Sequence, residues 1–501
     1  MKRISLLLFF IGCFLFSLSA TNYFVATNGS DSNSGTIDKP FATLGKAQSK
    51  VMAGDTVYIR QGTYRVTEAE IMEHYTAGST TWSRVFKMSK SGTGPDKRIC
   101  YSGYKKERPV FDLSVVKPEN ERVIVFYVSG SYLHFRNIEV VGTQVTIVGH
   151  TQSECFRNEG GSDNIYEHLS MHDGMAIGFY IVTGKNNLVL NCDAYNNYDP
   201  VSDGGKGGNV DGFGGHLTSP QYTGNVFRGC RAWYNSDDGF DLINCQAVFT
   251  IDNCWSFLNG YTKDGGKAGD GTGFKSGGYG MSDNPKAPSV IPMHIVQYCL
   301  AYMNKNKGFY ANHHLGGIAW YNNTGYQNPS NFCMLNRKTA SEAVDVPGYG
   351  HIIKNNLSHK PRSSGKHIID VNQAECEIAN NSFLPVDMAV TDDDFVSLDA
   401  PYVEFLRLKT TSKLYNAGMG CFLAGGSEDT SYDWLEDAAI LVEGDVAKIV
   451  GHGAEAFVYF YINGKAVSFS DRQVDLSAYK GEIDLKATTD NGGVTKLKQI
   501  R

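Results

Sequence analysis

The stretch Asn235-Ser236-Asp237-Asp238-Gly239-Phe240-Asp241 lies in a region where the dipeptide Gly-Phe returns at regular intervals. Its glycine falls at positions 178, 212, 239, 273 and 308, so the intervals are 34, 27, 34 and 35 residues. Recurrence on this scale is typical of a solenoid, in which each repeat buries a shared core against the next. The stretch therefore predicts an elongated repeat fold.

A second motif, Cys-x-Ala/Ser-aromatic-x-Asn, gives the same register, with asparagine replacing cysteine in the later repeats. The motif begins at Cys192, Cys230, Cys254, Cys299, Asn323, Asn356 and, more weakly, Asn380. The shortest interval is 24 residues, which indicates a bare coil, and the longer intervals carry insertions. The β-rich segments between the motifs are too short for helices. A parallel β-helix fits best, with like residues stacked about 4.8 Å apart.

This register predicts which residues lie side by side although they are far apart in the sequence. The residues after Gly-Phe form one column, which reads Tyr180, Gly214, Asp241, Lys275 and Tyr310. The residues before it form another, which reads Ile177, Asp211, Asp238, Thr272 and Lys307. Four carboxylates and one lysine should therefore meet on one patch: Asp211, Asp237, Asp238, Asp241 and Lys275.

Composition limits the function classes. The chain has 501 residues, 55 glycines and a formal net charge of −6, which argues against general binding to nucleic acid or other polyanions. Ten cysteines follow Cys13, four of them at one repeat position, where small thiols pack as hydrophobes. We therefore expect mostly free, buried cysteines, and no cysteine or histidine cluster suggests zinc.

The N-terminus predicts export. Residues 1–20 contain Lys2 and Arg3, an apolar run from Ile4 to Phe16 and a small-residue end, which together indicate a secretory signal peptide. Ile11-Gly12-Cys13 leaves a lipid anchor open as a less favoured alternative. No later apolar run approaches the length of a membrane span. We expect an exported monomer.

The remaining chain divides into two predicted domains. Residues 21–425 form the solenoid, with a short amphipathic helix between Phe41 and Met52 that caps its first coil and a closing cap at 386–425. Residues 430–501 have no cysteine and alternate in polarity, which predicts a small antiparallel β domain. Asn463-Gly464 after a strand is a strong hairpin signal.

The clustered carboxylates point to a bound cation, because they repel one another unless a positive charge neutralises them. Oxygen ligands without histidine or cysteine favour calcium over zinc. Lys275 is the odd member of the patch. An ordinary lysine is protonated at neutral pH, but a neighbouring cation can lower its pKa and free the amine to act as a base.

The run from Asn225 to Asp241, with Asp211-Gly212-Phe213 before it and Gly273-Phe274-Lys275-Ser276-Gly277-Gly278 after it, closely resembles the family-nine polysaccharide lyases. The resemblance covers about residues 21–425. It implies a right-handed parallel β-helix that cleaves pectic polysaccharides by β-elimination, with a pectate or rhamnogalacturonan backbone as substrate. It also implies that Asp211, Asp237, Asp238 and Asp241 bind calcium and that Lys275 is the catalytic base.

Substrate contacts are less distinct. Arg228, Arg231, Lys305 and Lys307 are candidates for holding other substrate carboxylates, and Tyr310 is a further candidate contact. The run Tyr310-Ala311-Asn312-His313-His314 departs from the acidic or amide residue expected there, which bears on fine specificity. Two other functions stay open: an inverting pectic hydrolase that uses Asp237 and Asp238, and a non-catalytic glycan-binding solenoid with structural calcium.

Overall fold

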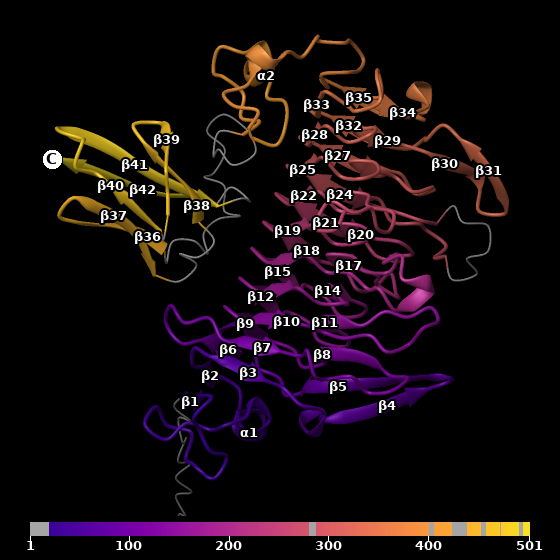
Figure 1. The fold of residues 1–501 in the computed structure, drawn as a ribbon. Coiled ribbons are helices and arrows are strands. Elements are labelled where there is room, and N and C mark those ends of the chain that lie inside the picture. Colours follow the sequence, from indigo (N-terminus) through magenta and orange to yellow (C-terminus); the bar gives the residue numbers. More distant parts are fainter. Residues whose placement is uncertain are drawn as a thin grey trace, which may run out of the picture.

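The computed structural model describes residues 20–279, 287–399, 405–422, 438–451, 457–470, 472–489 and 494–500. Residues 1–19, which hold nearly all of the predicted signal peptide, lie outside this part. Three long sheets run along the molecule, parallel except for one antiparallel pair near the N-terminal end, and each coil in the middle of the solenoid contributes one strand to each sheet. Figure 1 shows these coils stacked from the N-terminal end upwards, with the last strands of the chain alongside.

Sheet 1 begins with the first strand of the chain and takes one strand from each later coil. Its members are β1 (Asn22–Val25), β2 (Thr56–Ile59), β6 (Ile99–Gly103), β9 (Leu133–Arg136), β12 (Ile165–Glu167), β15 (Leu188–Leu190), β18 (Asn225–Arg228), β21 (Phe249–Asp252), β24 (His294–Gln297), β27 (Ile318–Tyr321), β32 (Ile352–Lys354) and β35 (Glu377–Ala379).

Sheet 2 carries the second motif. Its members are β3 (Thr63–Arg65), β7 (Val110–Asp112), β10 (Glu139–Val141), β13 (Ser170–His172), β16 (Asp193–Tyr195), β19 (Arg231–Trp233), β22 (Trp255–Phe257), β25 (Leu300–Tyr302), β28 (Thr324–Tyr326) and β33 (Leu357–His359).

Sheet 3 carries the Gly-Phe motif, and its strands shorten towards the middle of the chain. Its members are β4 (Glu73–Ala77), β5 (Thr80–Met88), β8 (Arg122–Val128), β11 (Glu154–Asn158), β14 (Ile177–Ile181), β17 (Phe213–Gly215), β20 (Phe240–Asp241), β23 (Phe274–Lys275), β26 (Phe309–Tyr310), β29 (Phe332–Cys333) and β34 (Ile368–Ile369).

The Gly-Phe motif explains how the interior is filled. The phenylalanines of successive coils stack face to face inside the solenoid, for example Phe240 on Phe274 with ring centroids 4.8 Å apart. The preceding glycine leaves room for the next coil: a Cβ on Gly212 would lie 2.7 Å from both the Ala232 Cβ and the Gly239 carbonyl oxygen. A larger residue at this position would push the coils apart.

The asparagine of the second motif ties neighbouring coils together. Asn259 donates through Nδ2 to the Ala232 carbonyl oxygen at 2.9 Å, and its Oδ1 accepts the backbone N–H of Asn235 at 3.1 Å. The same pattern continues through Asn304 and Asn328, and all of these side chains are buried. Each asparagine therefore satisfies backbone groups at the turn between sheets 2 and 3.

The ends of the solenoid differ from its middle. Helix α1 (Leu44–Lys50) begins after Thr43, whose side chain accepts the Lys46 N–H, and buries Leu44 and Ala47. It is shorter than the predicted range of 41–52. Near the other end, α2 (Lys413–Asn416) belongs to a segment that packs against the outer face of sheet 2, where Phe405 contacts Tyr302 with ring centroids 5.0 Å apart.

Two small antiparallel sheets follow. They contain β36 (Ala438–Glu443), β37 (Val446–Gly451) and β40 (Gln473–Asp475), and β38 (Phe457–Ile462), β39 (Lys465–Val467), β41 (Glu482–Thr489) and β42 (Val494–Ile500). The predicted hairpin is confirmed, because Asn463 and Gly464 both have positive φ, as a two-residue turn between β38 and β39 requires.

Short elements complete the described chain. A separate hairpin is formed by β30 (Asn336–Thr339) and β31 (Glu342–Val346). Five 3-10 helices lie in the connections: η1 (Glu68–Glu70), η2 (Pro95–Lys97), η3 (Ser202–Gly204), η4 (Gln373–Glu375) and η5 (Asp392–Asp394). The ten cysteines from Cys100 onward are free thiols, and eight of them are buried.

Candidate active site

The predicted register of sheet 3 is confirmed. Tyr180 pairs with Gly214, Gly214 with Asp241, Asp241 with Lys275 and Lys275 with Tyr310. The column before Gly-Phe is also regular, because the Gly212 N–H bonds to the Asp238 carbonyl oxygen. The repeat therefore brings residues from three coils onto one outer patch of sheet 3.

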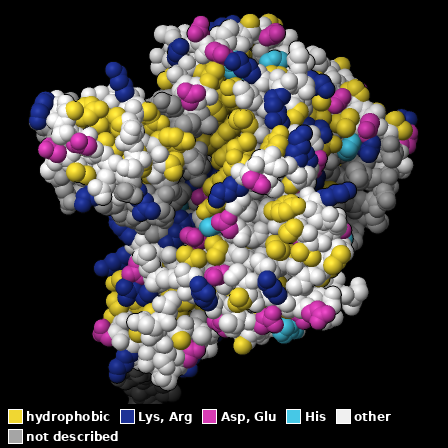
Figure 2. Space-filling model, viewed as in Figure 1, with side chains coloured by type: hydrophobic (Ala, Val, Ile, Leu, Met, Phe, Trp, Pro, Cys, Tyr) yellow, Lys and Arg dark blue, Asp and Glu magenta, His cyan; other side chains and the backbone are white. Residues whose placement is uncertain are grey.

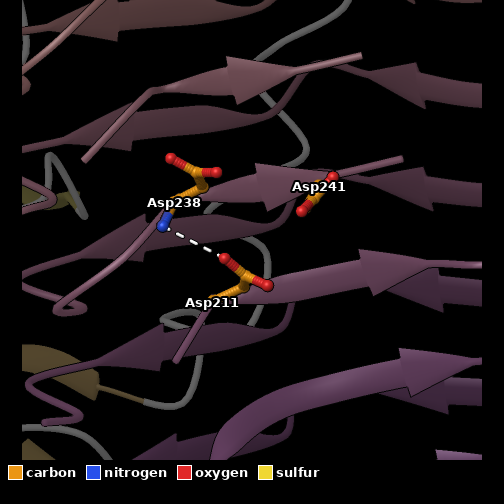
Figure 3. Close-up of side chains that lie close together, drawn as sticks. All are labelled: Asp211, Asp238 and Asp241. Carbon is orange, nitrogen blue, oxygen red and sulfur yellow. Dashed lines mark hydrogen bonds between the residues drawn. The ribbon is translucent and has the colours of Figure 1, made fainter. Parts of the chain in front are cut away.

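Three aspartates form the centre of this patch. Asp211 and Asp238 directly precede the Gly-Phe of their coils, and Asp241 ends β20. One carboxylate oxygen of each lies within 4.8 Å of the others, and all three side chains are buried. Figure 3 shows Asp211 and Asp238 on adjacent coils, joined by a 3.1 Å hydrogen bond from the Asp238 N–H to Asp211 Oδ1.

Lys275 faces this cluster from the next coil. Its Nζ lies 3.0 Å from Asp241 Oδ2 and 3.1 Å from Asp238 Oδ2. Its side chain is 18 % exposed, and its amine is held by the two carboxylates. This geometry is that of a positioned amine at the edge of an acidic, oxygen-only site.

The electrostatics of the cluster are unbalanced. Burial, followed by repulsion from neighbouring carboxylates, raises the pKa of Asp211 well above its ordinary value, and burial does the same for Asp238. Burial alone would lower the pKa of Lys275, but the surrounding aspartates outweigh it and raise that pKa well above 10.5. One ammonium group therefore cannot compensate all of the acidic side chains, and the site calls for a further positive charge.

Asp237 lies beside this group and not within it. Its Oδ1 accepts the backbone N–H of Asp270 at 2.7 Å, and burial raises its pKa to about 6. The adjacent carbonyl of Ser236 and the Asp237 carboxylate both approach the loop at Gly269. In this structure Asp237 therefore anchors the insertion at 261–272 while its backbone neighbour, Asp238, enters the cluster.

Comparison with known proteins agrees with this arrangement. Residues 23–369 match the model of the Pel9A-like, right-handed β-helix region, and residues 372–496 match the model of the rhamnogalacturonan lyase-like C-terminal region. The chain belongs to the Pel9A-like family of polysaccharide lyases. The right-handed parallel β-helix is thereby confirmed.

Two groups of Pel9A-like relatives are informative. Pectate lyase L of Dickeya chrysanthemi is 33% identical over 415 residues, which cover 79% of this chain and 85% of that protein. A solved structure of a rhamnogalacturonan lyase is 53% identical with a TM-score of 0.76, covering 80% of this chain and 100% of that one. The crystal structure of pectate lyase Pel9A is 31% identical with a TM-score of 0.62, covering 81% and 97%.

Arg231 was expected to contact substrate, and this expectation is wrong. Its side chain is fully buried, and Nε and Nη2 both lie 2.7 Å from the Asp193 carboxylate in a two-pronged ion pair. The pair could have been found from the sequence, because Asp193 and Arg231 each follow the cysteine of the second motif and so face each other in register. Arg231 stabilises sheet 2 of this Pel9A-like fold.

Arg228 and Lys305 also lie away from the cluster. Arg228 ends β18 on sheet 1, where its Nε lies 2.7 Å from Asp252 Oδ2, so it faces a different side of the solenoid. Lys305 donates through Nζ to the Ala268 carbonyl oxygen at 2.9 Å and to the Gly269 carbonyl oxygen. It therefore holds the insertion that Asp237 also anchors.

Lys307 and Tyr310 do lie on the face of the candidate site. Tyr310 is the neighbour of Lys275 in the column, and the Lys307 amine lies 4.5 Å from the centre of its ring. On the other side of the cluster the column continues through Gly214 to Tyr180 and then Arg157. Tyr180 was in the predicted column, but its position beside a cavity could not be seen from the sequence.

Within the described residues, no helix is both long and apolar enough to cross a lipid bilayer.

Proposed function

We propose that this chain cleaves a galacturonate-containing pectin backbone by β-elimination, with Lys275 as the general base. The observation that carries the proposal is the Lys275 amine, held 3.0 Å from Asp241 and 3.1 Å from Asp238 at the edge of the buried cluster. An inverting hydrolase needs a carboxylic acid and a carboxylate, and would give this amine no part in the chemistry. Elimination gives it one, and the names of the relatives support the same reaction.

We propose that Asp211, Asp238 and Asp241 bind calcium, with Asp237 as a further ligand. The residues present fit this ion. They offer oxygen atoms only, and burial together with repulsion from neighbouring carboxylates raises the pKa values of Asp211 and Asp238. A hard divalent cation suits a buried, acidic site of this kind.

Bound calcium would supply positive charge beside the carboxylate of the substrate and make the C5 proton more acidic. Lys275 Nζ, in its neutral form, takes that proton. The electron pair of the C5–H bond becomes the C4–C5 double bond as the bond from C4 to the glycosidic oxygen breaks. That oxygen takes a proton from water, and the product carries an unsaturated uronide. Asp241 and Asp238 orient the amine throughout.

Lys275 must lose its own proton before it can act. In the structure the carboxylates raise its pKa, which holds the amine in its protonated form. Neutralising those carboxylates removes this bias and leaves burial, which lowers the pKa, as the main influence. Base strength in this site should therefore depend on the charge of the cluster as a whole.

Of the two polymers, we propose the rhamnogalacturonan I backbone, in which galacturonate alternates with a neutral deoxy sugar. Two findings support this choice: the 53% identity to a solved rhamnogalacturonan lyase over its whole length, and the match of residues 372–496 to the C-terminal region named for such lyases. Pectate is the second candidate, because several relatives at about one-third identity carry the name pectate lyase.

Lys307 and Tyr310 are the proposed substrate contacts beside the base, since they lie next to Lys275 on the same face. We further propose that residues 1–20 are a signal peptide, that the mature protein is exported as a monomer, and that the solenoid ends near residue 425.

The test measures near-ultraviolet absorbance on mixing the protein with rhamnogalacturonan I and, separately, with polygalacturonate, in calcium and in chelator. A calcium-dependent rise that Lys275→Ala abolishes is the expected result. New reducing ends without a rise in absorbance would instead indicate hydrolysis. Binding without any cleavage would indicate a glycan-binding solenoid.

A further inference from the structure

A cavity of about 300 Å³ opens on the outer face of sheet 3, directly beside the aspartate cluster. It is lined by residues of six successive coils, from β8 to β23, and those used below are Arg122, Glu154, Arg157, Tyr180, Val182 and His216. Asn244, which also lines it, lies in the same coil as Asp241, so the cavity and the cluster share a wall. Its volume lies at the lower end of the range for small-molecule sites.

Two arginines and one glutamate line this cavity, and Glu159, which is not part of the lining, is a second ion-pair partner of Arg157. The Arg157 guanidinium lies between two carboxylates, 2.8 Å from Glu154 and 2.9 Å from Glu159. Glu154 is 1 % exposed, and Arg122 supplies the second positive charge at the rim. A sugar that carries a carboxylate would meet Glu154 as a like charge, whereas a neutral sugar would not.

The remaining wall is apolar and aromatic. Ile177, Tyr180 and Val182 form a hydrophobic cluster of their own on this outer surface, separate from the core. The Tyr180 ring lies over Gly214, where an added Cβ would come within 2.6 Å of the ring. The His216 ring lies 4.7 Å from the Tyr180 ring, and its buried Nε2 has no hydrogen-bond partner among the described residues. The cavity thus offers the face of a ring, an apolar surface beside it and a buried polar atom on His216.

We propose that this cavity is a subsite for a neutral deoxy sugar, which occupies it next to the galacturonate held at Asp241 and Lys275. The sugar's methyl group packs on Val182 and Tyr180, and its hydroxyl groups bond to polar atoms such as His216 Nε2. The subsite makes the proposed function more specific and rests on it. An alternating acidic and neutral backbone satisfies both sites at once, but a polymer of uronates puts a carboxylate beside Glu154.

The experiment compares kcat/KM for rhamnogalacturonan I with kcat/KM for polygalacturonate, in calcium, for the full chain and two variants. Tyr180→Leu removes the ring and should lower kcat/KM for rhamnogalacturonan about tenfold, mainly through KM. Glu154→Gln keeps the shape but removes the negative charge. It should shift the ratio of the two values about tenfold towards polygalacturonate.

Glu167→Gln is the matched control, because Glu167 is likewise an ion-paired glutamate of a solenoid strand, with its side chain 18 % exposed, but lies on sheet 1. It should leave the ratio unchanged. Thermal melting of every variant separates a folding defect from a loss of recognition, and Glu154→Gln keeps the test valid if Tyr180→Leu does not fold.

The outcomes separate this inference from the proposed function. Calcium-dependent elimination with both expected shifts supports the subsite. Elimination with an unchanged ratio in folded Glu154→Gln, or a wild-type preference for polygalacturonate, overturns the subsite and leaves the lyase proposal standing. No elimination of either polymer by the wild-type chain overturns both.

Discussion

Sheets 2 and 3 both align one residue of every coil on their outer surface, but they use the alignment in opposite ways. On sheet 2 the column is aromatic from β13 to β33, and neighbouring rings such as Tyr195 and Trp233 stack 4.2 Å apart and within 6° of parallel. Its members are His172, Tyr195, Trp233, Phe257, Tyr302, Tyr326 and His359. On sheet 3 the corresponding column changes character at every coil, from Tyr180 through Gly214 and Asp241 to Lys275.

The difference shows what repetition does in a solenoid. A residue that repeats meets its own kind above and below, so its contacts stabilise the stack. Part of the sheet 2 column is covered by the segment that contains Phe405, and Figure 2 shows hydrophobic side chains gathered along the side of the solenoid that faces the C-terminal strands. A residue that breaks the repeat adds little to the stack and marks the place where chemistry can occur.

The largest expected effect comes from Lys275, one of the residues that break the repeat on sheet 3. Lys275→Ala should lower kcat about 10³-fold or more, because the general base is lost, while the melting temperature in calcium stays close to that of the wild type. The measurement is the initial rate of absorbance increase on rhamnogalacturonan I. Lys185→Ala, which removes an exposed lysine from a turn, is the control. Full activity in Lys275→Ala would show that Lys275 has no catalytic role.

The next effect concerns the proposed ligands. Asp241→Asn and Asp238→Asn each remove one negative charge from the cluster and should weaken calcium binding by roughly tenfold or more. High calcium concentrations should partly restore activity. Calorimetric titration of calcium measures the binding directly. An affinity equal to that of the wild type in both variants would exclude the cluster as the calcium site.

A substitution in a column whose residue does repeat should affect stability and not catalysis. Asn323 accepts the Cys299 N–H at 3.0 Å and donates to the Val296 carbonyl oxygen at 2.9 Å, and it is fully buried. Asn323→Ala should lower the free energy of unfolding by about 2–3 kcal/mol, because buried backbone groups lose their partners. The folded fraction should keep the wild-type kcat. Chemical denaturation and assays below the transition test both statements.

The pH dependence of stability should distinguish the cluster from the rest of the chain. Burial raises the folded-state pKa of Asp237 to about 6 and raises those of Asp211 and Asp238 well above their ordinary value. The folded state thus binds more protons than the unfolded state above about pH 4, so its stability falls as pH rises from 4 through 6. Thermal melting in chelator should show this fall and melting in calcium should not. Parallel profiles would contradict the assignment.

The smallest effect is expected for a single ring of the aromatic column. Trp233 stacks on Tyr195 and on Phe257, and Trp233→Leu should cost about 1 kcal/mol of stability beyond the change in buried area. Activity per folded molecule should not change. A loss of activity larger than the loss of folded protein would mean that sheet 2 also takes part in function.

Much of the fold and of the candidate site could be predicted from the sequence because the fold is periodic. The spacing of Gly-Phe placed Asp241 beside Lys275, although 34 residues separate them, and the structure has that pairing. The prediction of substrate contacts was wrong for two arginines, because it ignored what surrounds each side chain. Arg231 and Arg228 were chosen for their charge alone, but burial against Asp193 and a position on sheet 1 decide what they contact.

The cavity beside Tyr180 could not be predicted for a related reason. It depends on the tilt of one ring over Gly214 and on the pairing of Arg157 with two glutamates, and neither follows from the repeat. Asp237 is a similar case. The repeat gave its neighbour Asp238 a place in the column, but whether the Asp237 side chain joins the cluster depends on the loop at Asp270.

The most direct test of the central claim is a crystal structure of the protein grown with calcium, with the ion located by its anomalous scattering. The account predicts an ion bound by oxygen atoms of Asp211, Asp238 and Asp241 at about 2.3–2.6 Å, beside Lys275. A calcium ion bound elsewhere on the chain, with this cluster still free of metal, would contradict it.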